Sequence, residues 1–115
     1  MPAKPSPRRA LVTGGSGELG GAVSLALAAG GYDVIVHANR SLHRAEAVVN
    51  AIREAGGSAQ ATAFDVSDMQ VTHAALEALL DEGPIHALIN NAGIHDDAPM
   101  AGMSADQWHR VIDVS

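Results

Sequence analysis

The sequence predicts an α/β fold in which a doubly wound parallel sheet lies between two layers of helices. Short apolar runs alternate with amphipathic runs along the 115 residues, the pattern of strand–helix–strand units. Hydrophobic residues make up 47% of the chain and are mostly aliphatic, which suits helices packed closely on a buried sheet. Right-handed crossovers between four strands then predict the strand order 3-2-1-4.

The first half of the chain predicts two strand–helix pairs. Residues 10–13 (ALVT) form the first strand and residues 18–29 the helix after it. Residues 32–37 (YDVIVH) form the second strand. A second helix spans residues 41–55 and ends before Gly56 and Gly57, because glycine favours helix termination. Its inward face is predicted from apolar residues at helical spacing: Leu42, Ala45, Val48, Val49 and Ile52.

The second half predicts two further strands, each followed by a helix. Residues 58–64 (SAQATAF) form the third strand, and Ser67 begins a helix because Gln70 follows at capping-box spacing. Residues 86–90 (HALIN) form an apolar strand, as expected at the centre of a parallel sheet. The third helix has the buried stripe Ala75, Leu76, Leu79 and Leu80. The last helix begins at Ser104, with Gln107 three residues on, and directs Trp108, Val111 and Ile112 inward.

The composition excludes several classes of protein. A net charge of −6 disfavours non-specific binding to nucleic acid, which needs clustered Lys and Arg. The absence of cysteine excludes disulfides and thiolate metal sites, and the six histidines lack the spacing of paired metal ligands. No apolar stretch approaches the length of a membrane span. We therefore expect a cytoplasmic protein with a flexible arm over residues 1–8 and one domain over residues 9–115.

Residues 11–20 (LVTGGSGELG) place glycines at the turn from the first strand to the first helix. One spacing is TGxxGxxG, through Gly14, Gly17 and Gly20; the other is TGxxxGxG, with Glu18 in the place of a glycine. Glycines there let the backbone turn tightly and approach a pyrophosphate, which amides at the helix N-terminus then bind. The position predicts a dinucleotide site, with a plain strand-to-helix turn as the alternative.

The end of the second strand favours NADP over NAD. NAD sites usually carry an acidic residue about 20 residues after the glycine loop, bonded to the ribose 2′-hydroxyl. This chain has instead His37, Ala38, Asn39 and Arg40. Asn39 can donate hydrogen bonds and Arg40 can pair with a 2′-phosphate. The alternative is that Arg40 faces water at the strand end.

Three motifs after the later strands complete a family pattern. They are FDVSD (64–68), NNAG (90–93) and WHRVIDVS (108–115), and together with the glycine loop they resemble the short-chain dehydrogenase/reductase family from about residue 9 onward. Within its single-domain branch the sequence is most similar to 3-oxoacyl-acyl-carrier-protein reductases. The resemblance implies the amino-terminal half of a Rossmann-like domain, truncated after the fourth strand and its following helix.

The resemblance favours the TGxxxGxG spacing, which makes Glu18 a departure from the pattern. Its side chain either obstructs the pyrophosphate or points outward from the first helical turn, where it interacts favourably with the helix dipole. The implied cofactor residues are Gly14, Gly15, Ser16, Gly17, Glu18 and Leu19 for the pyrophosphate, Asn39 and Arg40 for the ribose phosphate, Asp65 and Val66 for adenine, and Asn91, Ala92 and Gly93 for the ribose. Taken without the family, Asp65 is equally well a cap for the turn before Ser67.

The family's catalytic tyrosine and lysine, four residues apart, have no counterpart here. The one tyrosine is Tyr32 and the one lysine is Lys4, and Ser115 occupies the position of the family's helper asparagine. We therefore assign no catalytic or metal-binding residue.

The predicted function is the NADP-binding half of a reductase of a 3-oxoacyl thioester or similar carbonyl, as in fatty acid biosynthesis, inactive alone. An acyl-carrier-linked substrate and a homo-oligomer would belong to the complete enzyme. The alternatives are a non-catalytic nucleotide-binding or partner-binding module, or a non-functional truncation.

Overall fold

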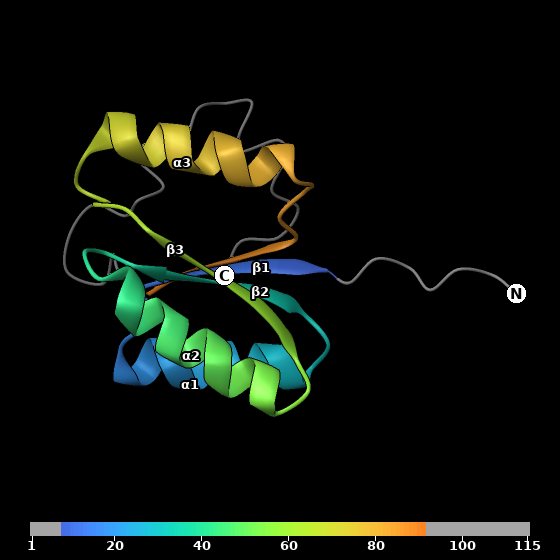
Figure 1. The fold of residues 1–115 in the computed structure, drawn as a ribbon. Coiled ribbons are helices and arrows are strands. Elements are labelled where there is room, and N and C mark those ends of the chain that lie inside the picture. The colour runs from blue at the N-terminus through green and yellow to red at the C-terminus, as the bar shows by residue number, and fades with distance from the viewer. Residues whose placement is uncertain (1–7, 92–115) are drawn as a thin grey trace, which may run out of the picture.

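The fold is a four-stranded parallel sheet in the order β3-β2-β1-β4, as predicted from the sequence (Figure 1). The computed structural model describes residues 8–91. The strands are β1 (Arg9–Thr13), β2 (Asp33–Ala38), β3 (Ser58–Ala63) and β4 (Ala87–Asn90), and the helices are α1 (Glu18–Ala29), α2 (Leu42–Glu54) and α3 (Met69–Asp81). Each helix connects two strands of the sheet, so the α/β class is confirmed.

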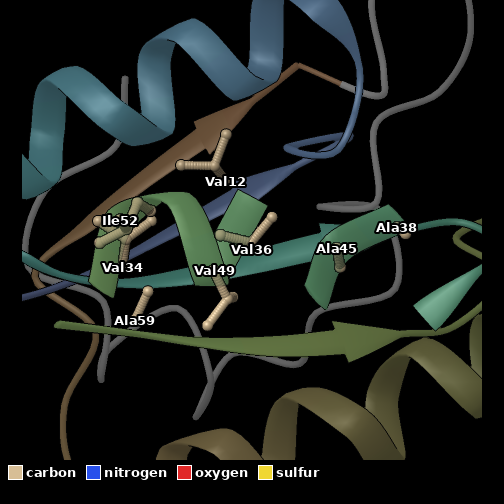
Figure 2. Packing of buried hydrophobic residues seen from close by; sticks show 8 residues of the cluster. All are labelled: Val12, Val34, Val36, Ala38, Ala45, Val49, Ile52 and Ala59. Atoms are coloured by element: carbon tan, nitrogen blue, oxygen red, sulfur yellow. The ribbon is translucent and has the colours of Figure 1, made fainter. Parts of the chain in front are cut away.

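The helices form layers on both faces of the sheet, with α1 and α2 on one side and α3 on the other (Figure 1). Successive strand residues face opposite sides, so each face has its own core. The core under α3 consists of Leu11, Ile35, Leu76, Leu79, Leu80, Ile85 and Leu88. The core under α2 consists of Val12, Val34, Val36, Ala38, Ala45, Val49, Ile52 and Ala59 (Figure 2).

The register of the sheet brings four chain segments to one edge. Thr13 pairs with Asn90, and Ala38 pairs with Ala63. Because all strands are parallel, the carboxyl ends of β1, β2, β3 and β4 meet at the same edge of the sheet. The glycine loop after β1 therefore lies beside the residues that follow β2 and β4.

The predicted start of α3 at Ser67 is wrong. Asp68 is the N-cap, and its carboxylate accepts a hydrogen bond from the backbone N–H of Val71 at 3.1 Å. Ser67 instead donates both its backbone N–H and its hydroxyl to Oδ1 of Asp65, at 2.9 and 2.7 Å. A serine engaged in the preceding turn is not available to cap the helix, so the aspartate takes that position.

Three predicted core positions are less buried than expected, and one of them, Val48, is half-buried against the core under α2. Leu42 is 45% exposed, because the first residue of α2 precedes the turns that pack on the sheet. Ala75 is half-buried, whereas its neighbours in the stripe, Leu76, Leu79 and Leu80, are buried as predicted.

Several predicted features lie outside the described residues. They are the arm up to residue 7, the last helix with Trp108, Val111 and Ile112, and the site residues Ala92, Gly93 and Ser115. Within residues 8–91, no helix has the length and apolar character needed to span a membrane. Within the same range, no group of three or more His, Asp or Glu side chains is arranged to hold a metal ion.

Candidate functional site

A cavity of about 650 Å³ lies at the carboxyl ends of β1 and β2. Parallel sheets bind ligands at this edge, at the point where the strand order reverses, which here lies next to β1. A second cavity, of about 460 Å³, lies along α2 and β3 and includes no residue of the glycine loop. The larger cavity is lined by Gly14, Ser16, Gly17, Ala38, Asn39, Arg40, Ser41 and Arg44.

The glycine loop brings the N-terminus of α1 to this cavity. Gly14 has a φ of 66°, a conformation that side chains rarely adopt, and the N–H of Gly17 donates to its carbonyl at 3.2 Å. Gly17 is the N-cap of α1, and no side chain caps the helix there. The first amides of α1 lack partners within the helix, so they are available to an anionic ligand.

Gly20 lets α1 pack directly against the loop. A Cβ atom at this position would overlap the carbonyl oxygen of Gly14 and lie 2.7 Å from the Cα of Gly15. At Gly17, by contrast, a Cβ would meet only the Gly14 oxygen, at 3.6 Å. The close approach of helix and strand thus depends on Gly20, which both predicted spacings contain.

Glu18 is the first residue of α1 and is exposed. It does not line the larger cavity but an adjoining hollow beside α1 and α2, which shares Ser16, Gly17 and Arg44 with that cavity. The exposure of Glu18 agrees with the outward of the two orientations expected from the sequence. Its charge lies in the first helical turn, where the helix dipole favours a carboxylate.

The loop is held from both sides by side chains of neighbouring strand ends. The N–H of Gly14 donates to Nδ1 of His37 in β2 at 3.0 Å. The carbonyl of Gly14 accepts from Nδ2 of Asn91, directly after β4, at 3.2 Å. This contact places Asn91, the second residue of the NNAG motif, at the glycine loop, whereas the role of His37 was not predicted. The one sequence signal for it is its place at the end of the strand that neighbours the loop.

The ends of β2 and β3 are joined at the far side of the cavity. Oδ1 of Asn39 accepts the backbone N–H of Val66 at 2.9 Å. The two hydrogen bonds from Ser67, and more weakly the charge of Arg40, lower the pKa of the Asp65 carboxyl. Asp65 is thus a turn cap, as one of its two interpretations required. The structure places Asp65 and Val66 next to Asn39.

Two cations line the cavity. Arg40 was predicted from the sequence, but Arg44 was not, because it belongs to α2 and approaches the cavity through the packing of that helix. Tyr32 directly precedes β2, so it lies at the amino ends of the strands, opposite the cavity. The described residues thus bring together a glycine loop and two arginines, but not the tyrosine.

Known proteins similar in sequence to this chain are named as reductases or oxidoreductases. The chain is 35% identical over 103 residues to the 3-oxoacyl-[acyl-carrier-protein] reductase FabG of Aggregatibacter actinomycetemcomitans, covering 89% of this chain and 43% of that protein. It is 40% identical over 105 residues to the uncharacterized oxidoreductase YgfF of Escherichia coli (strain K12), covering 90% of this chain and 42% of that protein. The chain therefore spans less than half the length of these relatives.

Solved structures show the same fold. A metagenomic short-chain oxidoreductase in complex with NADP matches with a TM-score of 0.72 and 29% identity, over 90% of this chain and 48% of that one. A 3-oxoacyl-[acyl-carrier protein] reductase from Brucella melitensis matches with a TM-score of 0.68 and 34% identity, over 79% of this chain and 36% of that one. The family model described as short chain dehydrogenase matches residues 8–115. The chain therefore belongs to the short-chain dehydrogenase/reductase family of oxidoreductases.

Proposed function

We propose that the protein binds NADP(H) in the cavity between the glycine loop and the end of β2, as the cofactor-binding part of a reductase. The observation that carries this proposal is the charge of the cavity: Arg40 and Arg44 line it, with Ser41, and none of its described lining residues is acidic. A carboxylate there would bind a ribose 2′-hydroxyl and repel a 2′-phosphate, whereas guanidinium groups pair with phosphate.

The residues that line the cavity fit the pyrophosphate and the 2′-phosphate of the cofactor. The amides at the start of α1 would hold the pyrophosphate, next to Gly14 and Gly17. Arg40 and Arg44 would hold the 2′-phosphate. Bound NADPH would supply the hydride for reduction, and the protein orients the cofactor and fixes its phosphates. The remaining predicted contacts are Gly15, Ser16 and Leu19 at the pyrophosphate, Asn39 at the ribose phosphate, Asp65 and Val66 at adenine, and Asn91, Ala92 and Gly93 at the ribose. Glu18, also predicted at the pyrophosphate, does not line the cavity.

The proposed substrate is a 3-oxoacyl thioester or a similar carbonyl compound. Relatives named as 3-oxoacyl-[acyl-carrier-protein] reductases, at 35–36% identity, support this class. In such a reduction the carbonyl carbon takes a hydride from NADPH and the oxygen takes a proton, which gives a hydroxyl group and NADP. Because Tyr32 lies at the opposite ends of the strands, it is not the proton donor.

We expect the 115-residue chain to bind NADPH without reducing a carbonyl substrate. The chain alone would then act as a non-catalytic nucleotide-binding module, which is one of the alternatives given by the sequence analysis. A reduction assay that follows NADPH absorbance with a 3-oxoacyl thioester tests this point. Turnover by the purified chain would contradict the inference that the proton donor is absent from it.

The cofactor proposal is tested by titration of the chain with NADPH and with NADH. Arg40→Ala and Arg44→Ala should each raise the Kd for NADPH about three- to tenfold and leave the Kd for NADH nearly unchanged, because exposed charge pairs contribute modestly. Arg53→Ala is the matched control: Arg53 lies on the same helix as Arg44 but does not line this cavity. Equal losses for both cofactors, or no binding to the unsubstituted chain, would refute the proposal.

A further inference from the structure

His37 is a fully buried polar side chain beside the glycine loop. It lies one residue before the end of β2 and is 0% exposed. Its ring packs against Phe64, which directly follows β3, with ring centroids 4.3 Å apart. A buried imidazole needs a partner for each nitrogen, since an unsatisfied polar atom in the core destabilises the fold.

Both ring nitrogens of His37 have partners on different chain segments. Nδ1 accepts the N–H of Gly14 at 3.0 Å, and Nε2 lies 2.8 Å from the carbonyl oxygen of Phe64. Because Nδ1 accepts, the proton must lie on Nε2, which donates to Phe64. The ring is therefore neutral in one tautomer and connects the glycine loop to the end of β3. Burial lowers the pKa of His37, which agrees with a neutral ring.

Gly14 is the residue at which the loop leaves β1. Its N–H is held by His37 and its carbonyl by Asn91, so the peptide groups on both sides of Gly14 are held by neighbouring strand ends. With a φ of 66°, Gly14 sets the direction in which the loop proceeds to Gly17 and the N-terminus of α1. A ligand that needs those amides in one orientation binds more tightly to a loop that is already ordered.

We propose that His37 is a positioning residue for the dinucleotide site, which orients the glycine loop by accepting the amide of Gly14 on Nδ1. It touches no cofactor atom and acts through the loop. This inference rests on the proposed NADP(H) binding, but the orientation of the loop is measurable without cofactor.

Two substitutions separate the two hydrogen bonds of the ring. The side-chain oxygen of asparagine reaches about as far from Cα as Nδ1 does, so His37→Asn retains an acceptor for Gly14 and loses the donor to Phe64. Glutamine is one methylene longer, so His37→Gln places its amide near Nε2, retains the donor to Phe64 and leaves the Gly14 N–H without its acceptor. Both variants replace the ring by a smaller polar group and give up one buried hydrogen bond.

If His37 positions the loop, His37→Gln weakens NADPH binding about tenfold more than His37→Asn does, although urea denaturation shows similar losses of stability. Without cofactor, hydrogen exchange of the Gly14 amide is faster in His37→Gln than in His37→Asn. Equal exchange rates in the two variants, or NADPH affinities that follow stability alone, would overturn the inference. Failure of the unsubstituted chain to bind NADPH would reject the proposed function, whereas the exchange rates would still decide the role of His37.

A measurement on the unsubstituted chain covers the case in which neither variant folds. Nitrogen-resolved NMR of the histidine rings should show His37 as the neutral Nε2–H tautomer at neutral pH. A ring protonated on Nδ1 could not accept from Gly14 and would overturn the inference.

Discussion

The packing of α1 against the glycine loop predicts opposite effects for two neighbouring alanine substitutions. In Gly20→Ala the new Cβ would overlap the carbonyl oxygen of Gly14 and lie 2.7 Å from the Cα of Gly15. Both neighbours are backbone atoms, so no side chain can rotate away and α1 must move from the loop. In Gly21→Ala the nearest atoms, the Gly15 oxygen and Cγ2 of Val48, lie at 3.8 Å, an ordinary contact.

The expected energies follow from packing and helix propensity. Overpacking costs about 1–3 kcal/mol, and alanine in place of glycine within a helix returns up to about 1 kcal/mol. Gly20→Ala should therefore lower the free energy of unfolding by about 1–2 kcal/mol, because its overlap involves rigid backbone. Gly21→Ala gains helix propensity without an overlap, so it should raise the free energy of unfolding by up to about 1 kcal/mol.

Urea denaturation followed by circular dichroism measures both variants. With a slope of about 1 kcal/mol per molar urea, the midpoint should fall by roughly 1–2 M for Gly20→Ala and rise for Gly21→Ala. Because the two residues are adjacent in α1, any general effect of alanine on the helix is common to both. A Gly20→Ala midpoint at or above that of the unsubstituted chain would refute the close packing described here.

Two further predictions concern α3 and β2. Asp68→Ala should lower the free energy of unfolding by about 1 kcal/mol, because the N-cap acceptor for Val71 is lost. Gln70→Ala should change the free energy of unfolding by less than about 0.5 kcal/mol. Equal losses for the two variants in urea denaturation would support the predicted Ser67–Gln70 capping box instead. Burial lowers the pKa of His37 from 6.5, so as the pH falls through 6.5 the unfolded chain takes up a proton there before the folded chain does. Stability should then fall by up to about 1.4 kcal/mol per pH unit, and a pH series of urea denaturations should show a smaller slope for His37→Asn; identical slopes would contradict this assignment.

Strand order and site location were predictable because they follow from local patterns. Apolar runs and glycines mark each strand and its turn, and the handedness of the crossovers then gives the order β3-β2-β1-β4. The same order places the glycine loop, Arg40 and Asn91 at one edge, whatever the details of packing. These features depend on the order of strands and helices along the chain, which can be predicted from the apolar runs and glycines.

The missed features depend on specific side-chain contacts, some within one turn and some between distant segments. Ser67 and Asp68 are both good N-cap residues, and the choice falls to Asp68 because Asp65 binds the Ser67 hydroxyl. Arg44 reaches the cavity through the packing of α2. His37 finds its partner Gly14 through the register of β1 and β2, which no local pattern reports.

The position of Glu18 bears on our proposal that this acidic chain binds an anionic cofactor. The protein carries a net charge of −6, so its overall field repels a dinucleotide phosphate. The cavity is nevertheless lined by Arg40 and Arg44, while Glu18 faces the hollow beside α1 and α2. Position 18 does not require a glycine, because the close contact between α1 and the loop is made at Gly20. The pyrophosphate site that we propose at the N-terminus of α1 therefore does not require a glycine at residue 18.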